Sequence, residues 1–224
     1  MRALHVHHDA NSSPGLIGEA LDARGWDAQV HQVCEVAGSP VGGTEFPDPA
    51  GVDLVVLYGS RWSVYDPEVA HWVEPELDFL RRADAAGVPV LGLCFGGQLL
   101  SAAFGGEVTA SDVPEIGWHK VVPRAARIEP GPWLQWHFDR FTVPDGAEEL
   151  AVSDAGPQAF QLRRNLALQF HPEADRQVLE GWFADDADQL VAVGVEPAEL
   201  LTETGRQGVA ARARADRLLD GFLR

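Results

Sequence analysis

The stretch from Val88 to Phe104 constrains the fold of this chain more than any other segment. A short apolar run, Val88 to Leu93, is typical of a buried strand, and a second apolar run, Leu99 to Phe104, is typical of a helix. The intervening Cys94-Phe95-Gly96-Gly97-Gln98 predicts a tight turn. A strand that passes through a tight turn into a helix indicates an α/β fold.

The first half of the chain repeats this alternation of apolar runs and amphipathic stretches, which favours βαβ units and a mostly parallel sheet. A segment rich in Gly and Pro, from Ala37 to Gly51, is interpreted as a long surface loop. The pattern predicts strands over Ala3–His7, Ala28–Val33 and Asp53–Tyr58, and helices over Gly15–Arg24 and Glu68–Ala86.

The second half has a different pattern. From Glu107 to Ala151, Pro-bounded pieces of irregular spacing predict antiparallel strands, including Trp118–Val122 and Leu134–Phe138. Two more strands, Gln158–Leu162 and Leu166–Phe170, are predicted to form a hairpin. The tail from Asp175 is helical in pattern and is broken over 194–197.

These elements predict a three-layer α/β fold whose central sheet is mostly parallel, with an antiparallel extension and a helical C-terminus. We expect a single domain over residues 1–224, in which about 184–224 form a helical extension, because 224 residues can bury one substantial core. A ligand site is expected at the carboxyl edge of the sheet, where open α/β sheets bind their ligands.

Composition narrows the function classes. The formal net charge of −17 argues against nucleic acid as a partner, since that affinity depends on Lys and Arg contacts to phosphate. No run approaches the roughly 18 apolar residues of a membrane span, and the first residues do not have the pattern of a signal peptide. Two cysteines do not make a disulfide framework, so we expect a cytoplasmic protein with no membrane partner.

The turn after Leu93 has the pattern of a nucleophile elbow, with Gly92 and Gly96 two positions either side of Cys94. Glycines suit such a turn because it is strained and its neighbours approach closely. The start of the following helix would favour the Cys94 thiolate, and the Phe95 N–H would point at an oxyanion formed on an attacked acyl carbon.

A thiolate nucleophile needs a base, and the base needs a group that orients it. Gln169-Phe170-His171-Pro172-Glu173 offers both at the end of a predicted strand. In a turn, Glu173 can reach one ring nitrogen of His171 while the other nitrogen faces Cys94. Each motif alone also occurs as a structural feature, a buried cysteine or a strand end, but their combination in this context predicts cysteine-dependent catalysis.

Gly92-Leu93-Cys94-Phe95-Gly96-Gly97-Gln98 and Gln169-Phe170-His171-Pro172-Glu173 closely resemble the two signature motifs of class I glutamine amidotransferases. Further similarity lies in Pro14–Gly25, Tyr58–Asp66, Glu115–Trp118 and Trp136–Asp139, so that it runs from about Arg2 to Phe183.

This resemblance implies the family's flavodoxin-like fold and a Cys94, His171 and Glu173 triad that hydrolyses the side-chain amide of glutamine through a glutamyl thioester. It also implies oxyanion-hole amides from Gly59 and Phe95, and a role for Gln98 in holding the amino-acid end of the substrate.

One departure from the family pattern lies in the loop after Tyr58. Members usually carry Gly-Gly-Pro or a similar sequence there, whereas this chain has Gly59-Ser60-Arg61-Trp62-Ser63. The missing Pro and the added Arg61 leave the resting geometry of the loop and the substrate preference open.

Other polar residues can be interpreted either as structural or as functional. His137 and Asp139 lie at a strand end and are candidates for the substrate pocket or for structural hydrogen bonds. His5, His7 and His8 do not share one face of a strand, so no metal site is predicted, and neither is a cofactor. Asp9 or His8 could act near the catalytic edge, and Cys34 is interpreted as a small buried hydrophobe.

Three functions stay open. The first is a glutaminase that supplies ammonia to a separate synthetase partner, because no P-loop or second catalytic domain is evident. The second is a stand-alone hydrolase of γ-glutamyl amides or peptides. The third is a non-catalytic binding or regulatory protein that has kept the fold.

Overall fold

The computed structural model describes the backbone of residues 1–224 and all side chains except those of residues 185–189 and 191–192. In these residues a single sheet has nine strands, in the order β2-β1-β3-β4-β9-β8-β7-β5-β6. The strands are β1 (Arg2–His7), β2 (Asp27–Gln32), β3 (Leu54–Leu57), β4 (Val90–Leu93), β5 (Val108–Pro123), β6 (Gly131–Phe141), β7 (Glu148–Ser153), β8 (Gly156–Leu162) and β9 (Asn165–Leu168).

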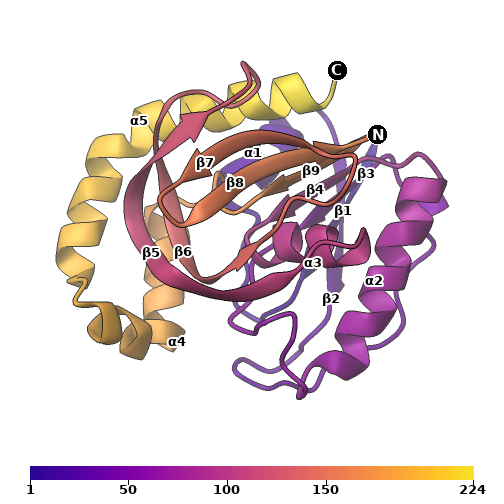
Figure 1. Cartoon of the computed structure of the whole chain (residues 1–224), viewed down its shortest axis with the longest axis horizontal. Helices are drawn as coiled ribbons and strands as arrows, with labels where there is room; N and C mark the ends of the chain where they lie inside the picture. Colours follow the sequence, from indigo (N-terminus) through magenta and orange to yellow (C-terminus); the bar gives the residue numbers. More distant parts are fainter.

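The sheet is mixed. Strands β2, β1, β3, β4 and β9 pair in parallel through four ladders. Four antiparallel ladders then join β9 to β8, β7, β5 and β6. The α/β class is confirmed, but the expected dominance of parallel pairing is not, because the described residues form as many antiparallel ladders as parallel ones. Figure 1 shows the antiparallel part curling away from the parallel part.

Helices lie against both faces of the parallel strands (Figure 1). Alternate residues of β3 separate two cores: Leu54 and Val56 pack into one cluster, while Val55 and Leu57 pack into the other. The first cluster includes residues of α1 (Gly15–Ala23) and α5 (Pro197–Phe222), and the second includes residues of α2 (Ala70–Ala85) and α3 (Phe95–Ala103).

A third cluster covers the antiparallel part of the sheet. Helix α4 (Arg176–Val193) contributes Val178 and Leu179, which pack with Ile116 of β5 and Leu134 of β6. A short 3-10 helix, η1 (Pro49–Gly51), lies within the long predicted loop. None of the helices, as far as the structure describes them, is both long enough and apolar enough to cross a membrane.

Several predicted elements need new boundaries. Strands β5 and β6 are much longer than predicted, and a register shift between Ala110 and Glu115 explains the irregular spacing of β5. Helix α3 begins at Phe95, four residues before the predicted start. The hairpin of β8 and β9 is confirmed as antiparallel pairing, and the break between α4 and α5 lies where it was predicted.

Candidate active site

The site lies where several parallel strands end. Gly59 follows β3 closely, Cys94 follows β4 directly, and His171 comes three residues after the end of β9. Strands β3, β4 and β9 are consecutive and parallel, so their carboxyl ends share one edge. The topology therefore brings together residues that are far apart in the sequence, at the edge where such sheets bind ligands.

Cys94 has the backbone of a strained turn. Its φ of 51° and ψ of −106° are unusual for a residue with a side chain. Its N–H donates to the carbonyl oxygen of Leu168 at 2.8 Å, and its own carbonyl accepts the first hydrogen bond of α3, from Gln98 N at 3.0 Å. The nitrogen is thus tied to the neighbouring strand, and the sulfur projects at the N-terminus of a helix.

The glycines around Cys94 are required by close backbone contacts. A Cβ on Gly92 would lie 2.4 Å from the Gly96 oxygen, and one on Gly96 would lie 2.5 Å from Leu57 Cβ. A Cβ on Gly97 would lie 2.5 Å from the Leu168 oxygen. These distances are too short for any side chain, so the three glycines let the turn sit against β3 and β9.

His171 is held in place from two sides. Its Nδ1 donates to Glu173 Oε1 at 2.7 Å, and its backbone N–H donates to the Leu134 carbonyl at 2.8 Å. The Glu173 carbonyl in turn accepts from Leu16 N at 2.8 Å, and a Cβ on Gly15 would lie 2.1 Å from that same oxygen. The start of α1 therefore locks the turn that carries the histidine and the glutamate.

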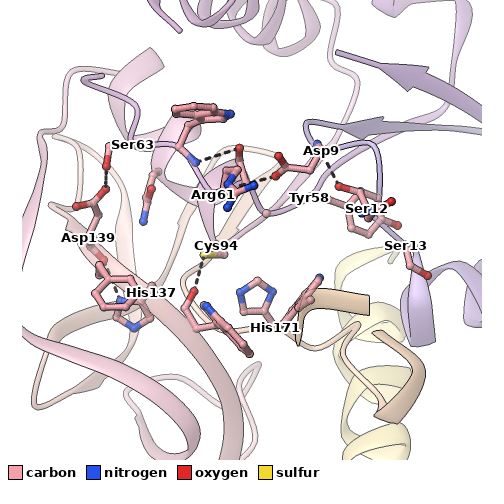
Figure 2. A pocket seen from close by; sticks show the side chains of 18 of the residues that line it. Asp9, Ser12, Ser13, Tyr58, Arg61, Ser63, Cys94, His137, Asp139 and His171 are labelled. Carbon is pink, nitrogen blue, oxygen red and sulfur yellow. Dashed lines mark hydrogen bonds between the residues drawn. The ribbon is translucent and has the colours of Figure 1, made fainter. Parts of the chain in front are cut away.

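Gly59 lies close to both His171 and Cys94, so the segments after β3, β4 and β9 meet at this point. A Cβ built on Gly59 would lie 3.1 Å from His171 Cε1 and 3.9 Å from Cys94 Cβ. Glycine at this position leaves room for the imidazole and for a substrate atom between the loop and the sulfur. Figure 2 shows Cys94 and His171 next to each other beneath the loop that carries Arg61.

Charge in the site favours an imidazolium. Burial alone would lower the pKa of His171, but the neighbouring Glu173 and Cys94 outweigh it and raise the pKa to about 10. The other ring nitrogen, Nε2, is buried, and an interaction with the Cys94 side chain is among the causes of the raised pKa. His171 is therefore protonated at neutral pH, with its second N–H on the side of Cys94.

The loop after β3 is tied at both ends by carboxylates. Asp9 Oδ2 accepts from the backbone N–H of Arg61 at 3.1 Å. Asp139 accepts from Ser63 Oγ at 2.5 Å and from Tyr65 OH at 2.8 Å. Figure 2 shows these two aspartates on opposite sides of the pocket. The loop departs from the family pattern in sequence, but side-chain hydrogen bonds fasten it on both sides.

The three predicted substrate-binding residues all line the pocket, together with the triad. Gln98 is buried and its Nε2 donates to Gln169 Oε1 at 3.4 Å. The ring nitrogens of His137 face two acceptors, the Asp139 carbonyl at 2.9 Å and Glu115 Oε2 at 3.2 Å. These contacts fasten all three side chains to the protein, and substrate binding by them stays a prediction.

Glu115 is the centre of a buried polar network beside the pocket. Besides His137, its Oε2 accepts from Ser153 Oγ at 2.9 Å and from Gln158 Nε2 at 3.0 Å. Burial would raise the pKa of Glu115, but the hydrogen bonds from His137 and Ser153 outweigh it and lower the pKa. The network joins β5, β6, β7 and β8 and supports the wall that carries His137.

The three clustered histidines near the N-terminus, His5, His7 and His8, are all buried. His8 is fully buried and its Nε2 bonds both oxygens of Glu76, at 2.9 and 3.1 Å. His5 Nδ1 lies 2.8 Å from Tyr58 OH. Burial, with smaller effects from His5 and His8, lowers the pKa of His7 to about 4. Cys34 is buried too, and burial raises its pKa to about 11, which disfavours a reactive thiolate.

Sequence reasoning missed the aromatic wall beside His171. Trp182 of α4 lines the pocket, and its ring centroid lies 4.7 Å from that of His171 in an edge-on arrangement. Trp136 packs on Trp182 at 5.5 Å. A tryptophan in a helical tail usually packs in a core, so nothing in the sequence distinguished Trp182 from the other tryptophans.

Comparisons with known proteins agree with the motifs. The family model described as "Glutamine amidotransferase class-I" matches residues 27–183. A "glutamine amidotransferase-like protein" of Gibberella zeae is 28% identical over 75% of this chain and 71% of its own length. A GMP synthase (glutamine-hydrolysing) of Thermomicrobium roseum is 37% identical over 53% of this chain, but the match covers only 23% of that protein.

The fold has close relatives among solved structures. A glutamine amidotransferase from Thermotoga maritima superposes with a TM-score of 0.88 and 23% identity, covering 100% of this chain and 98% of that one. A glutamine amidotransferase from Methylobacillus flagellatus gives 0.84 and 24% identity, covering 99% and 93%. At this level of identity the likeness establishes the fold, and it extends over the C-terminal helices.

Proposed function

Because the chain belongs to the class I glutamine amidotransferase family, we propose that Cys94, His171 and Glu173 are its catalytic triad and that it hydrolyses the side-chain amide of glutamine. The observation that carries this proposal is the convergence of Cys94, the Glu173-bound imidazole of His171 and Gly59 at one edge of the sheet.

In the first half of the reaction, the Cys94 thiolate attacks the amide carbon of glutamine. The oxygen of that amide becomes negatively charged, and the N–H groups of Gly59 and Phe95 are its proposed donors. When the tetrahedral intermediate collapses, the C–N bond breaks and His171 gives its Nε2 proton to the leaving nitrogen, which departs as ammonia. A glutamyl thioester stays on the sulfur.

In the second half, neutral His171 takes a proton from water as the water attacks the thioester carbon. The C–S bond then breaks, its electron pair returns to sulfur, and glutamate leaves. Glu173 keeps the ring in the correct orientation and stabilises its charged form throughout. The edge-on contact with Trp182 covers one side of the imidazole and limits access of bulk water.

For the substrate's amino-acid end, we retain Gln98, His137 and Asp139 as candidate contacts, because all three line the pocket that contains Cys94. The side chains themselves already bond Gln169, Glu115 and the loop after β3, which supports a role in shaping the pocket.

A separate synthetase is the proposed recipient of the ammonia. The chain spans about a quarter of the length of the glutamine-hydrolysing GMP synthases that it matches, for example 24% of that of Staphylococcus carnosus. In those relatives the matched part is a minor share of the protein, and we propose that the acceptor reaction here belongs to a partner acting in trans. A cytoplasmic location is part of the same proposal, supported by two free cysteines.

For the architecture, we propose that residues 1–224 form one domain of the three-layer, flavodoxin-like type. Contacts of α5 with the end of α1 support this, because Arg24, the residue that follows α1, bonds Asp216 and Asp220 at 3.3 and 2.7 Å. The helical tail is thus packed on the first helix of the chain.

A test replaces Cys94 with Ala and measures glutamate and ammonia release from glutamine. We expect a loss of at least about a thousandfold, because a triad acts as a unit. Cys34→Ala is the matched control: it removes the other free thiol and should retain activity. Covalent labelling by a glutamine-analogue electrophile should follow the same pattern.

Full glutaminase activity in purified Cys94→Ala protein would refute the triad. Parallel assays with γ-glutamyl peptides test the substrate: faster turnover of these than of glutamine would replace amidotransfer with the hydrolase function. Absence of labelling in the wild-type protein would favour a non-catalytic role.

A further inference from the structure

A buried amide lies against the nucleophilic sulfur. The side chain of Gln169 is fully buried, and its Nε2 lies 3.7 Å from Cys94 Sγ, within the range of an N–H to sulfur hydrogen bond. Gln169 follows β9, and its backbone N–H is fixed by the Gln158 carbonyl at 2.9 Å. The amide therefore approaches the sulfur from the strand next to the one that carries the nucleophile.

A second glutamine sets the direction of this amide. Gln98, on the first turn of α3, donates its Nε2 to Gln169 Oε1 at 3.4 Å. Because the oxygen of Gln169 accepts this bond, its NH₂ group points toward the sulfur. Both side chains are buried, so water does not compete freely for either group. The two amides form a short chain that ends with an N–H donor at Cys94.

The second group in contact with the Cys94 sulfur is a hydrogen-bond acceptor. Cys94 Sγ lies 3.6 Å from the carbonyl oxygen of Trp136, which can accept a hydrogen bond from a thiol but not from a thiolate. The Gln169 N–H has the reverse preference, since a donor interacts more strongly with the charged sulfur. The two neighbours therefore favour different protonation states of Cys94.

We propose that Gln169 is a catalytic residue that donates an N–H hydrogen bond to the Cys94 thiolate, and that Gln98 is a positioning residue that orients it. The proposal rests on the assignment of Cys94 as the nucleophile. The bond stabilises the sulfur at two stages: before attack, and again when the C–S bond of the thioester intermediate breaks and its electron pair returns to sulfur.

His171, held by Glu173, is the charged group whose interaction with Cys94 is seen, and Asp9, Arg61 and Asp139 line the same pocket. An imidazolium also stabilises a thiolate, but it loses its proton during each turnover. Gln169 is uncharged and stays a donor at every stage and at every working pH. Its contribution is therefore separable from that of His171, because it persists after the histidine has given up its proton.

The test is the rate at which iodoacetamide alkylates Cys94, measured from pH 5 to 10 in a Cys34→Ala background. Only the thiolate reacts, so the rate follows its population and needs no substrate turnover. Gln169→Met keeps the length of the side chain and removes the donor. We expect alkylation about tenfold slower on the acidic side and a midpoint shifted to higher pH, with kcat reduced by a similar factor.

Gln135→Met is the matched control. Gln135 is also buried on a strand beside the site, but its Nε2 bonds Gln158 Oε1 at 2.6 Å. Its replacement should leave the alkylation profile unchanged. Gln98→Met should shift the midpoint in the same direction as Gln169→Met, by a smaller amount, and it serves as the test if Gln169→Met does not fold.

An alkylation profile of Gln169→Met, or of Gln98→Met in its place, that coincides with that of the parent protein overturns the proposal. So does an equal shift in Gln135→Met, because the effect would then be a general loss of packing. Failure of the triad assignment is seen separately, as glutaminase activity that survives Cys94→Ala.

Discussion

The two walls of the pocket are built by different means. On one wall, the turn at Cys94 is held by backbone packing: Gly92, Gly96 and Gly97 leave no space for a side chain against the neighbouring strands. On the opposite wall, the loop after β3 is held by the side chains of Asp9 and Asp139. Sterics fix the nucleophile, whereas hydrogen bonds fix the loop that faces it.

The two walls should therefore respond differently to mutation. A wall held by backbone contacts has no intermediate state, because an added methyl group either fits or displaces a strand. A wall held by a few hydrogen bonds can lose one of them and relax. Changes at the nucleophile turn should therefore affect folding and activity together, while changes at the loop should affect activity more than stability.

Gly96→Ala should have the largest effect. The new Cβ would lie 2.5 Å from Leu57 Cβ and 2.6 Å from the Leu57 carbonyl oxygen, so α3 must move away from β3. We expect a loss of about 1–3 kcal/mol or more in the free energy of unfolding, together with nearly complete loss of glutaminase activity. Denaturant unfolding and a glutamate-release assay measure the two quantities.

Gly221→Ala provides the control for this change. Gly221 lies in α5, and a Cβ there would meet no atom within 4 Å. Alanine is the better helix former, so stability should stay the same or rise slightly. If Gly96→Ala were as stable and active as Gly221→Ala, the steric account of the nucleophile wall would be wrong.

Glu173→Gln should have the next largest effect. It tests the nucleophile side of the pocket through the pH dependence of protein stability. The pKa of His171 is about 10 in the folded protein and about 6.5 in a model compound, so the charged imidazole stabilises the native state. That stabilisation is complete below about pH 6.5 and is lost as the pH rises toward 10. In the variant this pH dependence should be much weaker, and kcat should fall by at least about a hundredfold.

Thermal unfolding at pH 6 and pH 9.5 measures the stability effect in the parent and the variant. The loop-holding carboxylates bond to backbone and hydroxyl groups, so a loop variant such as Asp139→Ala should keep the parent's pH dependence of stability. An identical pH dependence in Glu173→Gln and the parent would contradict the role given to this ion pair.

Asp139→Ala should have the smallest effect of the three. It removes the acceptor of both Ser63 and Tyr65, so the loop would no longer be fastened to β6. We expect kcat/KM to fall about tenfold, equivalent to about 1.4 kcal/mol of transition-state stabilisation, with a minor change in unfolding temperature. Tyr65→Phe removes one of the two bonds and should lie between the variant and the parent.

A combined kinetic and thermal comparison of these proteins decides how the loop is held. Equal activity of Asp139→Ala and the parent would show that the backbone contact with Asp9 is sufficient. A collapse of stability in Asp139→Ala as severe as that of Gly96→Ala would erase the distinction between the two walls.

The difference between backbone packing and side-chain hydrogen bonds also explains which parts of the site could be predicted from the sequence. The nucleophile turn was predictable because backbone sterics restrict nearby residues to glycine, which leaves a local pattern around Cys94. The alternation of elements and the β8–β9 hairpin were predictable for a similar reason. The mostly parallel sheet with an antiparallel extension was confirmed only as a mixed sheet, because the irregular spacing of residues 107–151 hid how long β5 and β6 are.

Within the site, contacts across long sequence separations left no local signal. Asp139 bonds Ser63 and Tyr65 from 76 and 74 residues away, and Gln169 reaches Cys94 from 75 residues away. Trp182 lies in a helical tail whose sequence pattern gives no sign of a binding or catalytic site. Such residues can be named only once the chain is folded, because their roles depend on partners that propensity and periodicity do not specify.

Trp182 comes after both Cys94 and His171 in the chain, so it is synthesised after the reactive groups that it packs beside. A ribosome completes the nucleophile turn first, the imidazole some 77 residues later, and the tryptophan that covers the imidazole only after both. A nascent chain thus carries its reactive groups before it carries their shield.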